Sequence, residues 1–429
     1  MDNSWSSAAT RPERQIERSA RWIVVGVVGV LLLGVGMAVV LIGRGPVPPE
    51  ITAHFTPQDV ARGEAYMDGR YWLFAAGTTI RLCLLLAFVL TPLSAALRNL
   101  AVRVVPAHPA VAVALYIAVL VLLTELCLLP LGFYSGFVRE HAFGLSTQTA
   151  GGWLLDRGKG LLLMWVLLIP AGSLLAFLWR RYPGRWVVPA WLLGSVLLVV
   201  VVALAPVIVD PLFNTVKPLQ DPALRARVLA LAARAGLPVQ QVYEIDASRR
   251  TRKGNAYFTG LGSTKRIVVY DNLVTGNDPA AVELVLAHEM GHWKHAHIWK
   301  GLALSVLALG AVLWCGARVL EWAAARRLFH LAGAADIAGL PLFLLVVFSL
   351  NLLAMPLQSG ISRFFERQAD WESLQLARDS AAFIRSEVNL ARSNLADLNP
   401  PRPLVWLLYS HPPTGERIGM AEEFAKDNK

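Results

Sequence analysis

Seven long apolar stretches constrain this chain more than any other feature of its sequence. Each stretch holds about twenty residues or more, the length that a helix needs to cross about 30 Å of hydrocarbon. A single stretch could be a buried helix of a soluble protein, but seven in a chain with only 16% charged residues exclude that class. We therefore expect an α-helical integral membrane protein. The spans are expected at residues 22–43, 72–97, 110–132, 160–179, 186–209, 301–320 and 337–357.

The polar segments between and after these spans suggest how the chain is organised. Residues 1–209 are expected to hold five spans and residues 301–357 the last two, with polar segments at 210–300 and 358–429. Within the first polar segment, the spacing of apolar residues and the turn residues predict a helix and a small β element. The helix is expected at 222–235 and the strands at 242–246, 255–260 and 266–271.

A metal-binding motif, His288-Glu289-Met290-Gly291-His292, lies in a helix that is expected to begin at Asp278-Pro279. Residues four apart share a helix face, so the two imidazoles can hold one Zn²⁺ while Glu289 acts as a general base on water. The motif by itself also arises by chance. His295 and His297 are expected on a solvated face, because two His and one carboxylate already complete a catalytic zinc shell.

Glu366 and Asp370 are candidates for completing such a site from another helical stretch. They are also four apart and share a face. One carboxylate could bind the metal, while the second could orient a ligating His through its free N–H group. The alternative is an ordinary solvated helix that carries two acidic residues.

The sequence in this region resembles the type I CaaX prenyl endopeptidases, which are membrane zinc proteases. The resemblance begins with H-E-x-G-H-W at His288–Trp293 and continues with S-R-x-x-E-x-x-A-D at Ser362–Asp370. It extends over roughly residues 130 to 425, and the ordered combination is far more specific than H-E-x-x-H alone. The further matching segments are Gly254–Gly260, Lys265–Asp271 and Tyr409–Pro412 with Arg417.

The resemblance implies a zinc endopeptidase that cleaves peptide or protein substrates, which can be prenylated or embedded in the membrane. It implies one zinc per chain with Glu366 as the third ligand, and seven helices around a chamber capped by a mainly helical metalloprotease portion. A substrate would add as a strand along Asn255, Ala256 and Tyr257. His411 would donate to the oxyanion, and Arg417 would orient His411 or a nearby carboxylate.

Three other functions stay open at this point. A site-2-type intramembrane protease also carries H-E-x-x-H, but within an apolar span, whereas Glu283 and Lys294 flank the motif here. A non-enzymatic membrane chamber would not need the complete set of catalytic residues. A quality-control protease without prenyl specificity would suit a bacterial cell, which is suggested by the Ala/Leu/Arg-rich composition.

Charge bears on partners and placement. The net charge of +10 favours contact with anionic lipids, and no recognition fold for nucleic acid accompanies it. Arg81 and Glu125 lie inside expected spans, either as a buried pair or as the polar lining of a chamber. The positive-inside rule places the N-terminus in the cytoplasm, whereas the family resemblance places the zinc site there. We expect a bacterial inner-membrane protein with the catalytic side in the cytoplasm, following the resemblance.

Overall fold

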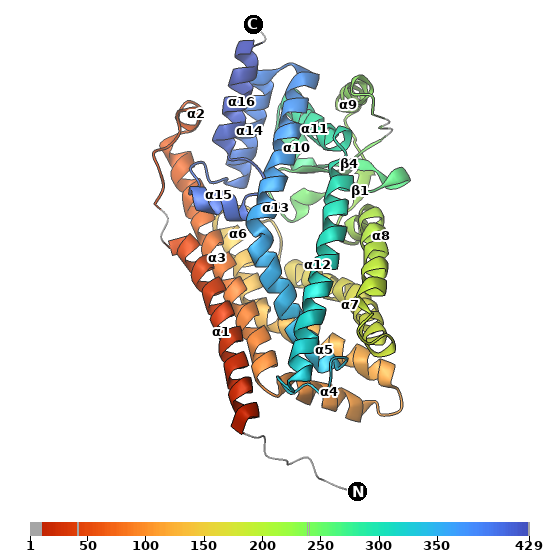
Figure 1. The fold of residues 1–429 in the computed structure, drawn as a ribbon. Helices are drawn as coiled ribbons and strands as arrows, with labels where there is room; N and C mark the ends of the chain where they lie inside the picture. Colours follow the sequence, from red (N-terminus) through yellow and green to blue (C-terminus); the bar gives the residue numbers. More distant parts are fainter. Residues whose placement is uncertain (1–10, 41–42, 238, 240, 428–429) are drawn as a thin grey trace.

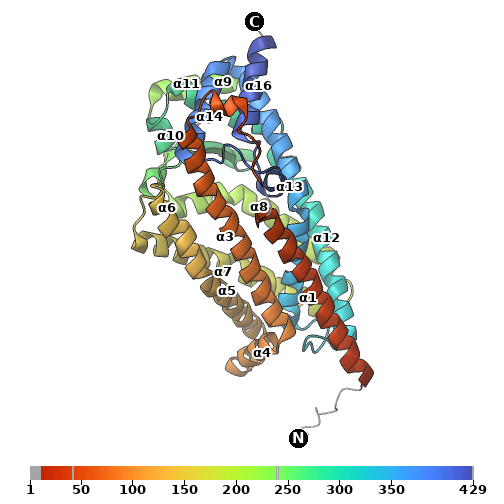
Figure 2. The ribbon, with the colours of Figure 1, turned by 90° about the vertical axis from the view of Figure 1, so that its left-hand side faces the viewer.

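A computed structural model describes residues 11–40, 43–237, 239 and 241–427. Long helices form one end of the molecule, and a small sheet with shorter helices forms the other (Figure 1). The N-terminal helix begins at the first end, whereas the C-terminal helix lies at the second. Figure 2 shows the same division from the side. The two ends correspond to the apolar and polar parts of the sequence.

Seven helices in the described residues are long and apolar enough to cross a membrane, which confirms the expected number. Several of these helices run beyond the apolar stretch that predicted them. The fifth contains two prolines within the helix. These helices are α1 (Arg11–Val40), α3 (Pro57–Leu90), α5 (Pro109–Phe133) with its continuation η1 (Tyr134–Val138) and α6 (Arg139–Ala142), α7 (Ala150–Arg181), α8 (Val187–Phe213), α12 (His297–Ala325) and α13 (Leu340–Ala377).

The second span differs from the prediction of 72–97, because α3 ends at Leu90 and a separate helix, α4 (Leu93–Val104), follows. Thr91 has an extended backbone with ψ of 167°. It precedes Pro92, and a residue before proline is disfavoured in the helical region. The chain therefore turns at Thr91-Pro92 instead of continuing one helix to residue 97.

A four-stranded sheet lies at the polar end, in the order β1-β2-β4-β3. Three of its strands confirm the sequence prediction: β2 (Val242–Ile245), β3 (Ala256–Thr259) and β4 (Arg266–Tyr270). The fourth, β1 (Val216–Pro218), was not expected and pairs antiparallel with β2. Because β3 pairs only with β4 in this sheet, its other edge lies outside the ladder, and there the amide of Phe258 donates to Glu289.

Three of the shorter helices share a core with this sheet: α9 (Pro222–Arg234), α10 (Asp271–Thr275) and α11 (Pro279–Lys294). Val242, Ile267 and Leu286 are fully buried in that core. The other helices of the polar end are α2 (Pro49–Thr52), α14 (Ser380–Asn394), α15 (Arg402–Leu408) and α16 (Thr414–Asp427), and the short 3₁₀ turns η2 (Ala247–Arg249) and η3 (Gly262–Thr264) lie beside the sheet. A third turn, η4 (Ile337–Gly339), lies in the membrane part and packs against α4.

Helix α13 joins the membrane part to the polar end without a break. It runs from Leu340 to Ala377, so the expected boundary between residues 357 and 358 falls inside one helix. Glu366 and Asp370 therefore lie on the continuation of the seventh span and not on a separate helix. One continuous helix therefore crosses the membrane and carries both acidic residues.

Candidate metal centre

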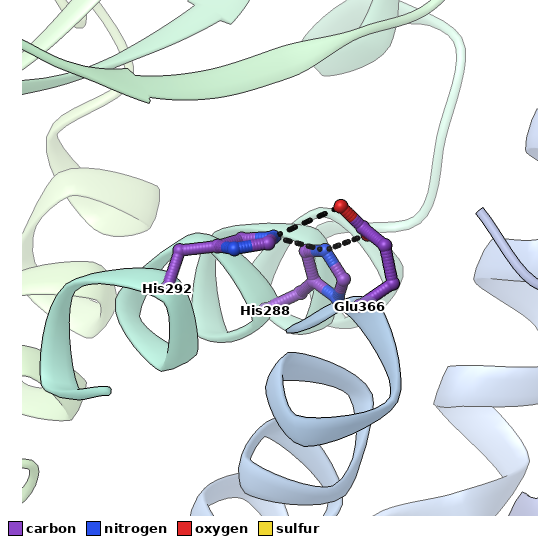
Figure 3. A group of neighbouring side chains, drawn as sticks. All are labelled: His288, His292 and Glu366. Carbon is purple, nitrogen blue, oxygen red and sulfur yellow. Dashed lines mark hydrogen bonds and ion pairs between the residues drawn. The ribbon is translucent and has the colours of Figure 1, made fainter. Parts of the chain in front are cut away.

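Three side chains converge where α11 crosses α13. One ligand atom from each of His288, His292 and Glu366 lies within 4.8 Å of the other two (Figure 3). The Nε2 atoms of the two histidines are 3.0 Å apart, and each lies near Glu366, at 3.1 Å for His288 and 3.5 Å for His292. The structure thus brings the motif on α11 together with a carboxylate that lies more than seventy residues later.

A glycine permits this close crossing. Asp278 caps the start of α11 by accepting a hydrogen bond from the amide of Ala280, which sets where the helix begins. Gly291 then faces α13, and a Cβ placed there would lie 2.8 Å from the Cα of Ala369. Any side chain at this position would push the two helices apart and separate Glu366 from the histidines.

Each histidine is held by a partner on its other ring nitrogen. Asp370 is fully buried, and its Oδ1 accepts from His288 Nδ1 at 2.7 Å. His297 donates from Nε2 to Gln368 Oε1 at 3.0 Å, so its Nδ1 accepts from His292 Nδ1 at 2.9 Å. Both ligand candidates therefore carry a proton on Nδ1 and turn Nε2, the atom that would bind a metal, towards Glu366.

The expectation that His297 lies on a solvated face was wrong. Its side chain is buried and stacks on Phe365 with ring centroids 4.3 Å apart. The chain turns at Ala296, whose φ of 55° lies in the left-handed region, and this turn between α11 and α12 brings His297 back against His292. His295 instead pairs with Glu372 at 3.3 Å, away from the cluster.

The geometry fits a tetrahedral zinc ion. Ligand bonds of about 2.0–2.1 Å at tetrahedral angles place ligand atoms roughly 3.3 Å apart, close to the distances found here. Glu366 Oε2 is buried and accepts no hydrogen bond from the described residues, which leaves it free for a cation. Burial disfavours protonation of His288, but Asp370 and then Glu366 outweigh it and raise the pKa of His288 to about 10. A metal cation would compete with that proton for Nε2.

Glu289 lies beside the cluster and against the sheet. It is buried, and its Oε2 accepts a hydrogen bond of 2.8 Å from the amide of Phe258 on β3. Burial raises the pKa of Glu289, although His288 and His292 oppose the shift. A carboxylate with a raised pKa next to a metal site is suited to accept a proton and return it.

The predicted substrate strand lies at the open edge of the sheet. Asn255 and Ala256 line a cavity that also contains His288 and Glu289. Tyr257 is not among the residues that line this cavity. Its ring packs edge-on against Tyr270 with centroids 6.4 Å apart. The first two of the three expected residues therefore line the cavity, and the third does not.

His411 and Arg417 occupy different places relative to the cluster. His411 Nε2 lies 3.3 Å from Glu366 Oε2, and its half-exposed side chain faces a cavity of about 660 Å³. Arg417 donates to both oxygens of Asp370, with Nε 2.9 Å from Oδ2. Arg417 therefore contacts the carboxylate that holds His288, in line with the second of the two roles expected for it.

Sequence reasoning missed a further carboxylate at this site, Glu387 on α14. It is buried, and its Oε2 lies 2.6 Å from Arg417 Nη1. Burial raises the pKa of Glu387 to about 7, against the opposing effect of Arg417. A signal was present in the sequence, because Phe383, Glu387 and Ala391 recur every four residues and place an acid on an apolar helix face.

Arg81 and Glu125 line a cavity of about 390 Å³ in the membrane part, together with Arg157 and many leucines. In the part of the chain that the structure describes, neither Arg81 nor Glu125 has a carboxylate or cation within 4.0 Å. The expected alternative of a buried ion pair is therefore wrong, and the alternative of a polar cavity lining holds.

Comparison with known proteins relates this arrangement to other chains. Residues 218–425 match the family model of Peptidase family M48, and residues 37–215 match that of the CAAX prenyl protease N-terminal region with five membrane helices. The first match contains α11, α13 and strands β2 to β4. The second contains four of the seven membrane helices, α3, α5, α7 and α8.

Individual relatives agree with these matches. The uncharacterized metalloprotease YhfN of Bacillus subtilis (strain 168) is 31% identical over 373 residues, 86% of either chain. CAAX prenyl protease 1 of Saccharomyces cerevisiae is 29% identical over 330 residues, 73% of either chain. The crystal structure of S. mikatae Ste24p superimposes with a TM-score of 0.83 at 25% identity, covering 93% of this chain and 98% of that one. The chain therefore belongs to peptidase family M48, as a multi-pass membrane metalloendopeptidase that resembles CAAX prenyl protease 1.

Proposed function

We propose that this metalloendopeptidase is zinc-dependent and binds one ion through His288, His292 and Glu366. The observation that carries the proposal is the convergence of two Nε2 atoms on Glu366, whose buried Oε2 accepts no hydrogen bond from the described residues. When bound, zinc would polarise the scissile carbonyl and lower the pKa of a water molecule. Asp370 and His297 hold the two imidazoles in the tautomer that this requires.

Glu289 serves as the general base in this proposal. Its Oε2 is occupied by the Phe258 amide, so Oε1 accepts the proton of the attacking water and passes it to the leaving amine nitrogen. The hydrogen bond also ties the base to β3, the edge along which Asn255 and Ala256 would bind the substrate backbone. Base and substrate would thus be positioned by one strand.

His411 would donate to the developing oxyanion, because its Nε2 lies near Glu366 and faces the larger cavity. Arg417 acts through Asp370, which its two hydrogen bonds hold in place. Arg417 is thus a positioning residue in this proposal, and His411 is a catalytic one.

The substrates in this proposal are extended segments of membrane-associated proteins. CAAX prenyl protease 1 is named for prenylated CaaX substrates, and its likeness to this chain favours that class here. The cavity of about 660 Å³ beside His411 offers room for several residues of such a segment. We further propose that the polar end, which carries the cluster, faces the cytoplasm of a bacterial cell. A reporter fused at Lys429 that is accessible only from outside intact cells would contradict this.

Peptide hydrolysis by the purified protein tests the function. Matched farnesylated and unmodified CaaX peptides are incubated with and without a chelator, and zinc is then restored. We expect cleavage that the chelator abolishes and zinc recovers. Cleavage that the chelator leaves unchanged would refute zinc dependence, and equal rates on the two peptides would favour the quality-control alternative.

A further inference from the structure

Arg70 is an exposed cation that lines the cavity of about 660 Å³ beside His411. It lies on α3, just before the apolar stretch at 72–97, on the helix that runs from the polar end into the membrane part (Figure 2). Its Nη1 donates to the Tyr66 hydroxyl at 3.2 Å. No carboxylate of the described residues lies within 4.0 Å of its guanidinium, so its charge and most of its N–H groups are available to a ligand.

The carboxylates that line this cavity already have cationic partners. Glu387 pairs with Arg417 at 2.6 Å, and Asp397 pairs with Arg44 at 2.7 Å. Arg70 therefore contributes a positive charge that no acidic side chain of the described lining balances. Besides the imidazole of His411, the other polar residues of the lining are neutral hydroxyls and carboxamides: Tyr71, Asn255, Asn394, Tyr409, Ser410 and Thr414.

The contacts around Tyr66 leave this positive charge unbalanced. The Tyr66 hydroxyl donates to Glu140 Oε1 at 2.5 Å, and Glu140 Oε2 lies 2.8 Å from Lys253 Nζ. Two cations, Arg70 and Lys253, thus meet one carboxylate. A charge at the boundary of an apolar span requires water or an ionic partner, and a guanidinium matches a carboxylate through two parallel hydrogen bonds.

The direction of β3 indicates which part of a substrate would reach Arg70. Asn255 and Ala256 line the recess beside Glu289, whereas Gly254 and Asn255 line the cavity that contains Arg70. That cavity therefore lies towards the start of β3. A substrate that pairs antiparallel with β3, the more stable of the two pairings, runs in the opposite direction to this strand. Its residues after the scissile bond would then extend past Gly254 into the cavity.

We propose that Arg70 binds the C-terminal carboxylate of the substrate, so that the enzyme selects chains that end shortly after the cleaved bond. The inference rests on the proposed function, because it takes the scissile bond to lie at the zinc cluster and the substrates to be CaaX tails. Three residues follow the cysteine of such a tail, and in extended form they span about 10 Å. The cavity of about 660 Å³ has room for them.

Peptides that differ only in a C-terminal carboxylate or carboxamide isolate this charge. We expect the unaltered enzyme to cleave a farnesylated CaaX peptide acid with a kcat/KM about 10- to 100-fold above that of the matching amide, the contribution of one hydrogen-bonded charge pair. Three residues added after the motif move the carboxylate about 10 Å further away and should remove the advantage.

Variants of Arg70 assign the preference to this side chain. Arg70→Gln should bring the acid-to-amide ratio to about one while zinc content and the rate on the amide stay unchanged. Arg70→Met, which keeps the apolar stem, gives the same test in a second side chain. Arg70→Lys keeps the charge without the planar fork and should retain part of the preference. Arg62→Gln, on the same helix but outside the cavity lining, is the matched control and should keep the full ratio.

Two results would overturn the inference. One is chelator-sensitive cleavage of acid and amide at equal rates by the unaltered enzyme, which leaves the proposed function standing and needs no variant to fold. The other is an Arg70→Gln or Arg70→Met protein with full zinc content that keeps the acid-to-amide ratio of the unaltered enzyme, because a residue with a structural role alone would act this way. Absence of any chelator-sensitive cleavage would instead refute the proposed function, and this inference with it.

Discussion

Charged side chains in the two ends of the molecule differ in whether they have charged partners. At the polar end, a chain of contacts runs from Glu387 through Arg417 and Asp370 to His288, with each neighbour within hydrogen-bonding distance. In the membrane part, Arg81 and Glu125 line one cavity and form no ion pair with any described residue. The first set of charges is held rigidly, whereas the second is not.

This contrast indicates different uses of charge. Partnered charges in a buried site fix the orientation of the groups that perform chemistry. Unpartnered charges in a membrane span are tolerated only where water or a polar guest solvates them. We therefore expect water or a polar guest in the membrane cavity, whereas the polar end holds its charged groups in fixed pairs. Substitutions in each part of the molecule distinguish the two uses of charge.

Removing a ligand should abolish metal binding. His292→Ala leaves two of the three donors, and we expect the purified protein to hold less than about a tenth of an equivalent of zinc and to lose activity. Metal analysis measures this. His295→Ala on the same helix is the control and should retain zinc, because His295 contacts Glu372 and not the cluster. Full zinc content in the His292 variant would refute the ligand set.

Removing the base should separate chemistry from metal binding. Glu289→Gln keeps the side-chain shape and can still accept from the Phe258 amide, so zinc content should be unchanged. We expect kcat to fall by about 10²- to 10⁴-fold, the contribution of a positioned general base. Steady-state hydrolysis of one peptide by both proteins gives the comparison. A variant within a few fold of the unaltered enzyme would exclude Glu289 from this role.

Breaking the series of contacts from Glu387 to His288 should weaken metal binding without abolishing it. Asp370→Ala frees the Nδ1 of His288 and leaves Arg417 with Glu387 alone, so we expect zinc affinity to fall about 10- to 100-fold. Competition with a chromophoric chelator measures the affinity. Glu416→Ala, which removes an exposed pair with Arg367, should have no measurable effect. Equal affinities for the Asp370 variant and the control would show that the chain of contacts does not support the site.

Changing the membrane cavity should leave the metal site intact. Arg81→Gln and Glu125→Gln remove charges that have no ionic partner among the described residues, so zinc content and the cleavage of a short soluble peptide should stay the same. Because none of the described residues that line this cavity belongs to the cluster, the effects of paired changes at Arg81 and Asp370 should add. A loss of zinc in the Arg81 variant would show that the two ends are coupled and would break the contrast.

Local patterns predicted much of this molecule, because the interactions involved are local. The seven spans follow from helix length and apolarity, and strands β2 to β4 from alternation between turn residues. The start of α11 follows from Asp278-Pro279, and the shared face of His288 and His292 from the helical repeat. The resemblance to a protease family supplied Glu366, which spacing alone left as one of two readings of an acidic helix.

What the sequence did not reveal depends on how elements cross. His297 contacts His292 because the chain turns at Ala296, and nothing in the local pattern announces that turn. Helix α13 carries both a membrane span and the acids of the site, which the change in polarity near residue 358 concealed. Arg417 reaches Asp370 only because α16 packs at this end of α13.

The sequence by itself determined the membrane class, the zinc-type motif and its two histidines and glutamate, since each is a matter of composition or of spacing within one helix. Only the tertiary structure decided that two Nε2 atoms and Glu366 meet in one place and that Glu387 faces a recess beside Glu289. The physical reason is the close approach of α11 to α13 at Gly291, where the absence of a side chain lets two distant segments form one site.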